Sequence, residues 1–311
     1  MHKPVLLREA VDALAIKPDG VYVDATFGRG GHSHLILSRL GEHGRLIALD
    51  RDPAAVEAAQ AIADPRFCIR HGSFSQMQQI VKTLGVAQVD GVLLDLGVSS
   101  PQLEEVSRGF SFRDSGPLDM RMDTSAGQTA AEWLATVSEA ELAQVIREFG
   151  EERFARPIAR AIVAAGAQQP IATTGQLASI VAATVRSRQR EHEHGKHPAT
   201  RTFQAIRIYL NRELDELAQV LPQCVNMLKP GGRLVVISFH SLEDRIVKRF
   251  MRDEAQGEQA PRRLPIPAAM LKPGRLQRVG RAQHATAAEV EANPRARSAV
   301  LRVAERMGEA A

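Results

Sequence analysis

The sequence predicts an α/β fold with a mostly parallel, twisted sheet and helices on both faces. Short apolar strands alternate with helical segments from Val21 to about Leu96, a rhythm typical of parallel sheets. A glycine-rich turn follows the first of these strands directly. From Thr129 to about Leu217 the pattern is helical without strands, and strands then resume. We therefore expect an all-helical module inserted into an α/β domain.

The first part of the chain predicts four strands separated by helices. We expect strands at 21–24, 45–50, 67–70 and 89–96, and helices at 32–40, at 53–63 and from about 74. Asp52 is the expected N-cap of the second helix, and Pro53 suits its first turn. The fourth strand is almost entirely apolar, which is typical of a strand buried on both faces.

Residues 107–128, rich in Gly, Ser, Asp and Pro, interrupt this rhythm. Capping-box patterns at 138–141 and 173–176, and a helix start at 198–200, follow in the helical segment. The sheet resumes near Gly231-Gly232, with strands expected at 233–239 and 299–304 and a helix at 242–251 between them. The expected boundaries are 1–106 and 216–311 for the two parts of the α/β domain and 107–215 for the inserted helical domain.

Composition indicates a soluble globular protein. Of 311 residues, 44% are hydrophobic and 24% charged, and two cysteines suggest neither a disulfide framework nor a metal knuckle. No signal peptide or long apolar run is visible, so we expect a cytoplasmic protein that does not associate with a membrane. Residues 256–311 hold ten Lys/Arg against five Asp/Glu. Such a basic end suits either a polyanionic partner or a solvated tail, and charge alone favours neither.

The glycine-rich turn predicts a nucleotide-type ligand. Gly28 and Gly30 match the first two positions of the dinucleotide fingerprint, but Ser33 takes the third and Gly31 is additional. Asp24, directly before the turn, would repel a pyrophosphate and suits a cationic ligand such as S-adenosylmethionine. The turn alone is weak evidence, since many such turns are glycine-rich.

Other candidate ligand residues follow the remaining strands, because α/β sheets bind ligands at the carboxyl ends of their strands. Asp50 lies at the spacing where a carboxylate meets the ribose hydroxyls. Phe74 follows the third strand and suits either purine stacking or the core, and Asp95 ends the fourth strand, where burial of a carboxylate requires a partner. Gln102 lies at an expected helix start, and by itself would be an ordinary surface glutamine.

Three further patterns have simpler interpretations. His192, His194 and His197 lack the helical spacing of a zinc site, so we expect no metal. Ser238–Ser241 lacks the nucleophile elbow of a hydrolase. Basic residues in two clusters suit phosphate contact, although for the second cluster a solvated helix face is equally plausible; the clusters are Arg186, Arg188, Arg190, Lys196, Arg201 and Arg207, and then Arg245, Lys248, Arg249 and Arg252.

Seven motifs in order together resemble the RsmH (MraW) family of S-adenosylmethionine-dependent 16S rRNA cytosine-N4 methyltransferases. The resemblance runs nearly end to end and rests on residues 24–33, 94–102, 116–123, 150–155, 197–205, 238–245 and 293–298. It implies a class I, Rossmann-like methyltransferase fold with an inserted helical substrate domain. It also implies that the cofactor is contacted by Gly30, Gly31, His32, Asp50, Phe74, Asp95 and Gln102.

The resemblance implies as acceptor the exocyclic amine of a cytidine at the decoding centre, in 16S rRNA, the small ribosomal subunit or its precursor. Asp95, Asp119 and His240 are candidate acceptors for the N4 proton, and Phe110, Phe112 and Phe239 are candidates to hold the base. The competing functions are a nicotinamide-dependent oxidoreductase, against which the missing third glycine argues, and a non-catalytic RNA-binding protein. The sequence does not determine the oligomeric state, and a homodimer is compatible with it.

Overall fold

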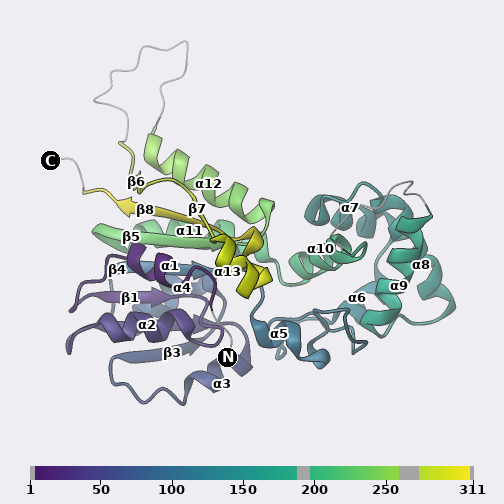
Figure 1. The fold of residues 1–311 in the computed structure, drawn as a ribbon, viewed down its shortest axis with the longest axis horizontal. Helices are drawn as coiled ribbons and strands as arrows, with labels where there is room; N and C mark the ends of the chain where they lie inside the picture. Colours follow the sequence, from purple (N-terminus) through teal and green to yellow (C-terminus); the bar gives the residue numbers. More distant parts are fainter. Residues whose placement is uncertain (1–3, 188–196, 259–272, 309–311) are drawn as a thin grey trace, which may run out of the picture. The chain divides into compact units, whose positions relative to one another are not determined.

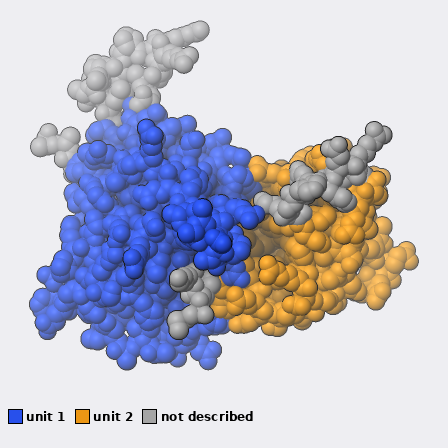
Figure 2. Space-filling view, in the orientation of Figure 1, with its two compact units in different colours: residues 1–97, 214–311 blue, residues 98–213 orange. Residues whose placement is uncertain are grey.

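The chain forms two compact units, described by a computed structural model for residues 4–187, 197–258 and 273–308. The sheet unit comprises Met1–Gly97 and Leu214–Ala311, and the helical unit comprises Val98–Glu213 (Figure 2). The helical unit thus begins at 98 and ends at 213, where composition predicted 107 and 215. The earlier start reflects local contacts, because the Met120 N–H donates to the Arg108 carbonyl at 3.0 Å and ties residues before 109 to the helical unit.

The sheet unit contains one eight-stranded sheet in the order β3-β2-β1-β4-β5-β8-β6, with β7 also pairing with β8 (Figure 1). Strands β1 to β5 pair in parallel, whereas β8 runs antiparallel to β5, β6 and β7. This confirms the predicted mostly parallel α/β class. The strands are β1 (Val21–Asp24), β2 (Arg45–Asp50), β3 (Phe67–His71), β4 (Val89–Asp95), β5 (Leu228–Ser238), β6 (Leu276–Arg278), β7 (Gln283–His284) and β8 (Val300–Arg306).

Helices cover both faces of this sheet, because successive strand residues point to opposite sides. Tyr22 packs with α1 (Leu7–Ala13) and α2 (Gly31–Arg39), whereas its neighbour Val23 packs with the other face's helices. Those helices are α4 (Met77–Thr83), α11 (Glu213–Met227) and α12 (Ser241–Gln256). On the first face α3 (Pro53–Ala59) also packs on Ala48.

Several element limits differ from the predictions. Helix α3 ends at Ala59 rather than at 63, since the N–H groups of Gln60, Ala61 and Ile62 donate to carbonyls three residues back instead of four. Strand β5 begins five residues early because Leu228 already pairs with Val89. The helical pattern expected to stop near Leu217 continues to Met227. Helix α1, α13 (Ala287–Ala292) and the short strands β6 and β7 were not predicted.

The helical unit has its own apolar core, in which Trp133, Leu142, Ile158 and Phe203 are buried. Thr173 forms the predicted capping box with Gln176, while Ser138 caps its helix from one side only. The helices are α5 (Ser100–Glu104), α6 (Ala130–Thr136), α7 (Glu139–Gly150), α8 (Ala155–Gln168), α9 (Thr174–Arg186) and α10 (Thr200–Leu210). Across both units, no helix in the described ranges is long and apolar enough to span a membrane.

Candidate cofactor site and catalytic residues

The glycine-rich turn joins β1 to α2 in a conformation that requires glycine. Gly30 has φ +74°, and a Cβ there would lie 2.7 Å from the Phe27 ring. At Gly31 a Cβ would overlap the Pro4 ring. The turn is held from within, since the Gly30 N–H donates to the Phe27 carbonyl at 2.7 Å. The predicted pair Gly30 and Gly31 therefore forms a tight backbone curve at the carboxyl end of β1.

Asp50 is fixed by two backbone donors at the end of β2. Its Oδ2 accepts from the Gly28 N–H at 2.7 Å and its Oδ1 from the Asp52 N–H at 2.8 Å. Burial nevertheless raises the pKa of Asp50 to about 6, and the charges of Asp52 and Asp24 add to this. Each oxygen keeps lone-pair capacity for a further donor, as a ribose contact would require.

Asp24 stabilises the start of α2 from inside the protein. It is 1% exposed, and its Oδ2 accepts from the Ser33 hydroxyl at 2.7 Å while its Oδ1 accepts from the Thr26 N–H at 3.2 Å. Burial raises its pKa. Ser33, which occupies the third glycine's place in the fingerprint, thus has a structural task that the sequence did not reveal.

His32 and Asp95 bring unpartnered polar atoms to this site. The His32 Nδ1 lies 3.5 Å from the Asp95 Oδ2, but His32 Nε2 and Asp95 Oδ1 are buried without a hydrogen-bond partner in the described structure. Burial lowers the pKa of His32 to about 4, so its ring is neutral at physiological pH and does not neutralise Asp95. Burial, and then the charges of Asp24 and Glu243, raise the pKa of Asp95 well above its usual range. Buried polar atoms without partners are uncommon, and these two indicate a ligand position.

Phe74 lies in a short 3₁₀ turn, Phe74–Gln76, and two side chains of α11 form hydrogen bonds with the residues around it. Glu216 accepts hydrogen bonds from the Ser73 hydroxyl and, at 3.3 Å, from the Ser75 N–H. Gln223 donates to the Ser75 carbonyl and accepts from the Gln78 N–H at 3.0 Å. These contacts were not predicted. A spacing of seven residues, which places Glu216 and Gln223 on one helix face, is the only signal of them in the sequence.

Gln102 belongs to the helical unit, where it completes the capping box of α5. It is 5% exposed, and its Oε1 accepts from the Ser99 N–H at 2.9 Å. An ordinary surface glutamine is therefore excluded. Its predicted cofactor contact stays a prediction.

Of the other two candidate proton acceptors, Asp119 is bound through both oxygens, whereas His240 is bound through Nδ1 and its Nε2 is buried without a hydrogen-bond partner in the described structure. Asp119, in the helical unit, binds Arg121 through both oxygens at 2.8 Å. Its pKa is lowered: burial pushes it upward, but the Arg121 hydrogen bonds and charge outweigh that. His240 is the N-cap of α12, and its Nδ1 accepts from the Glu243 N–H at 3.4 Å.

Several candidates for contact with the RNA or its target base already interact with other side chains. Arg207 binds Glu213 with two contacts of 2.8 Å, and Arg252 lies 2.7 Å from Asp253, so both are partly neutralised. Phe112 packs against Phe203 with ring centroids 4.7 Å apart. Phe110 is buried and Phe239 half-buried in separate apolar clusters. The predictions for Arg188, Arg190, His192, His194 and Lys196 lie outside the described residues.

Comparison with known proteins identifies the family that this chain resembles. The model of the MraW methylase family matches residues 1–307. The chain is 68% identical over 309 residues to the ribosomal RNA small subunit methyltransferase H of Thiobacillus denitrificans, covering 99% of this chain and 98% of the relative. It is 66% identical to the protein of that name from Azoarcus sp., covering 100% and 98%. A solved rRNA methylase from Streptococcus thermophilus aligns over 99% of both chains, but its TM-score of 0.43 and 9% identity are too low to inform the site.

Proposed function

The chain belongs to the MraW methylase family, and from that premise we propose that it methylates the exocyclic N4 of a cytidine in the decoding region of 16S rRNA. S-adenosylmethionine is its cofactor, on a class I, Rossmann-like fold. Family membership favours this function over a nicotinamide-dependent oxidoreductase or a non-catalytic RNA-binding protein. The names of the relatives in Thiobacillus denitrificans and Azoarcus sp. support small-subunit rRNA as the substrate.

One observation carries the chemistry: three acids end three neighbouring parallel strands, and no ion pair with Lys or Arg balances them among the described residues. Asp50, Asp24 and Asp95 terminate β2, β1 and β4 in the spatial order β2-β1-β4, so that Asp24 lies between the other two. The pKa of each is raised, first by burial, and the charge of Asp24 adds to the shift of both neighbours. A cofactor with a sulfonium and an ammonium group would relieve this repulsion.

The residues present fit such a cofactor. The Gly30–Gly31 curve leaves room where side chains would intrude, and His32 Nε2 and Asp95 Oδ1 still need partners. We assign the methionine end to Gly30, Gly31 and His32, the ribose to Asp50, and the adenine to Phe74. Gln102 is proposed as a further contact.

When bound, the cofactor supplies an electrophilic methyl group, so the protein must position the amine and remove its proton. The N4 lone pair is delocalised into the cytosine ring, and an acceptor for an N4 proton would localise it. We propose Asp95 as that acceptor, because its raised pKa makes its carboxylate a stronger base. Asp119, already bound to Arg121, is a weaker base, and His240 is engaged in capping α12. We propose that the helical unit recognises the RNA around this base.

A methylation assay tests this function. Small ribosomal subunits from a strain lacking the protein are incubated with labelled S-adenosylmethionine, and the modified nucleotide is mapped. We expect one N4-methylcytidine in the decoding region. Label at another atom, at another base or at no base would contradict the proposal, and calorimetry with S-adenosylmethionine and NADH would then separate a different acceptor from a different cofactor.

A further inference from the structure

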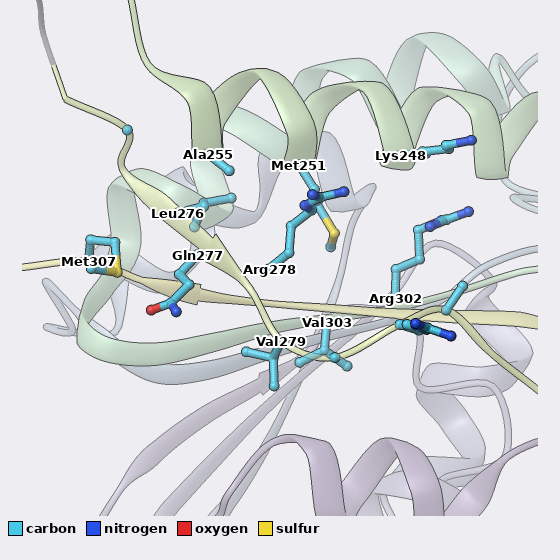
Figure 3. A pocket seen from close by; sticks show the side chains of 14 residues that line it. Lys248, Met251, Ala255, Leu276, Gln277, Arg278, Val279, Arg302, Val303 and Met307 are labelled. Carbon is cyan, nitrogen blue, oxygen red and sulfur yellow. The ribbon is translucent and has the colours of Figure 1, made fainter.

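The sheet unit contains a hollow of about 690 Å³ between α12 and the strands β6 and β8 (Figure 3). Its apolar surface comes from Met251, Leu276, Val279 and Val303. The loop after β6 completes the wall and includes Gly280, where a Cβ would meet no atom within 4 Å. We call this feature the basic hollow because of the charges that line it.

Four of the fourteen lining residues are cationic, and none is acidic. Arg302 is balanced, since Asp244 accepts from it at 2.6 and 3.0 Å. Lys248, Arg278 and Arg281 are exposed and have no acidic partner among the described residues. The basic hollow therefore retains three uncompensated positive charges.

The fold itself keeps nearby acids away from these cations. On α12, Asp244 and Lys248 lie four residues apart on one face, and Asp244 is held by Arg302. Glu254 binds Arg275 at 2.6 and 2.8 Å. Figure 3 shows Lys248 on the helix, with Arg278 and Arg302 on the strands that face it.

The basic hollow lies apart from the cofactor site within the same unit. Helix α12 starts at the carboxyl end of β5 and runs back along the sheet, and its lining residues Lys248, Met251 and Ala255 come from its middle and its second half. Strand β8 is antiparallel to β5, so Met307 lies beyond the pairing of Glu305 with Arg233, toward the amino end of β5. A ligand here would not occupy the positions of Gly30, Asp50 or Asp95.

Resting on the proposed function, we infer that the basic hollow binds the phosphodiester backbone of the rRNA substrate at a distance from the reacting base. Uncompensated cations suit phosphates, and phosphate contacts dominate nucleic-acid affinity. The lining contains no aromatic side chain on which a base could stack. The contact therefore adds affinity without reading sequence, and it gives the basic carboxyl-terminal region a polyanionic partner.

The test compares two double variants that remove the same charge. Lys248→Gln with Arg281→Gln alters the basic hollow, and Arg70→Gln with Lys82→Gln alters exposed cations elsewhere on the sheet unit. Binding of a small-subunit rRNA fragment is measured by fluorescence anisotropy across salt concentrations. Each phosphate contact contributes about 0.9 to the magnitude of the slope of log K against log salt. We therefore expect this magnitude to fall by about 2 in the first double variant and to stay unchanged in the second. KM for subunits should rise, while kcat, the Kd for S-adenosylmethionine and the unfolding midpoint stay unchanged.

Equal slopes for the two double variants would overturn the inference and leave a solvated helix face. Arg278→Gln alone provides a second measurement, with an expected slope loss of about 1. Failure of the proposed function looks different: wild-type protein would then show no N4 methylation, whatever its salt slope. If the wild-type protein methylates N4 but the variants of the basic hollow keep the wild-type salt slope, only the inference about phosphate binding in the basic hollow is rejected.

Discussion

Aspartates at the carboxyl end of the parallel sheet and in the segment 116–123 of the helical unit lie in opposite electrostatic environments. Asp95 lies near other carboxylates, its Oδ1 is buried without a hydrogen-bond partner in the described structure, and its pKa is raised. Asp119 is bound through both oxygens by Arg121, two residues along the chain, and its pKa is lowered. The first carboxylate needs a ligand to balance its charge, whereas the second is already balanced. An acid in a motif can therefore serve either chemistry or architecture, and its surroundings decide which.

The two regions also differ in how their backbones reach positive φ angles. The turn after β1 reaches positive φ at glycine, where such a conformation carries no steric penalty. The segment 116–123 reaches φ +64° at Met120, a buried non-glycine residue. Asn211 holds it there, donating to the Met120 carbonyl and accepting from the Met122 N–H, both at 2.8 Å. Tertiary hydrogen bonds thus maintain a conformation that local sequence disfavours.

The sharpest test of the contrast is the pair Asp95→Asn and Asp119→Asn. In single-turnover assays with saturating cofactor, we expect Asp95→Asn to lower the rate by about 10²- to 10⁴-fold, as loss of a general base does. The wild-type rate should rise with pH as Asp95 loses its proton, and the variant should lack this rise. Asp119→Asn should keep the rate within a few-fold. A loss in Asp119→Asn that matches Asp95→Asn, with cofactor affinity intact, would remove the distinction.

A second pair of variants tests whether the backbone conformation of the glycine-rich turn determines cofactor affinity. Gly30→Ala and Gly231→Ala impose similar backbone strain, at φ +74° and +76°, but only the first meets a neighbour, the Phe27 ring at 2.7 Å. Both should cost about 1 kcal/mol or more of stability in thermal unfolding. Calorimetry should show about 10- to 100-fold weaker S-adenosylmethionine binding for Gly30→Ala, equivalent to about 1.4–2.7 kcal/mol. Weakening of the same size in Gly231→Ala would show that general strain is responsible.

The smallest expected effect is a pH dependence of the cofactor-free protein. Asp50 has a pKa of about 6 in the folded state against 3.8 ordinarily, so between these values the folded state binds more protons than the unfolded state. Its carboxylate therefore destabilises the fold progressively as pH rises from about 4 to 6. The melting temperature of Asp50→Asn relative to wild type should be a few degrees higher at pH 7 than at pH 4.5. A difference that does not change with pH would contradict the charge imbalance at this end of the sheet.

Much of the sheet unit could be predicted because its signals are local. Strands β1 and β2 match the predicted limits, and Asp52 caps α3 by accepting from the Ala54 N–H at 3.0 Å, as expected. Helix α1 and the strands β6 and β7 were missed, since their few residues carry too little periodicity. They form because tertiary contacts complete them, as when the Val279 N–H donates to the Val303 carbonyl at 2.9 Å.

The sequence by itself determined the α/β class, the glycine turn and the family, because periodicity, turn chemistry and motif order are properties of neighbouring residues. Only the tertiary structure decided which acids are compensated. The pKa of Asp95 depends on Asp24 and Glu243, which are far from it in the chain, and the turn bearing Phe74 depends on Glu216 and Gln223. Burial and electrostatic interaction sum over all atoms nearby in space, so no stretch of sequence could specify them.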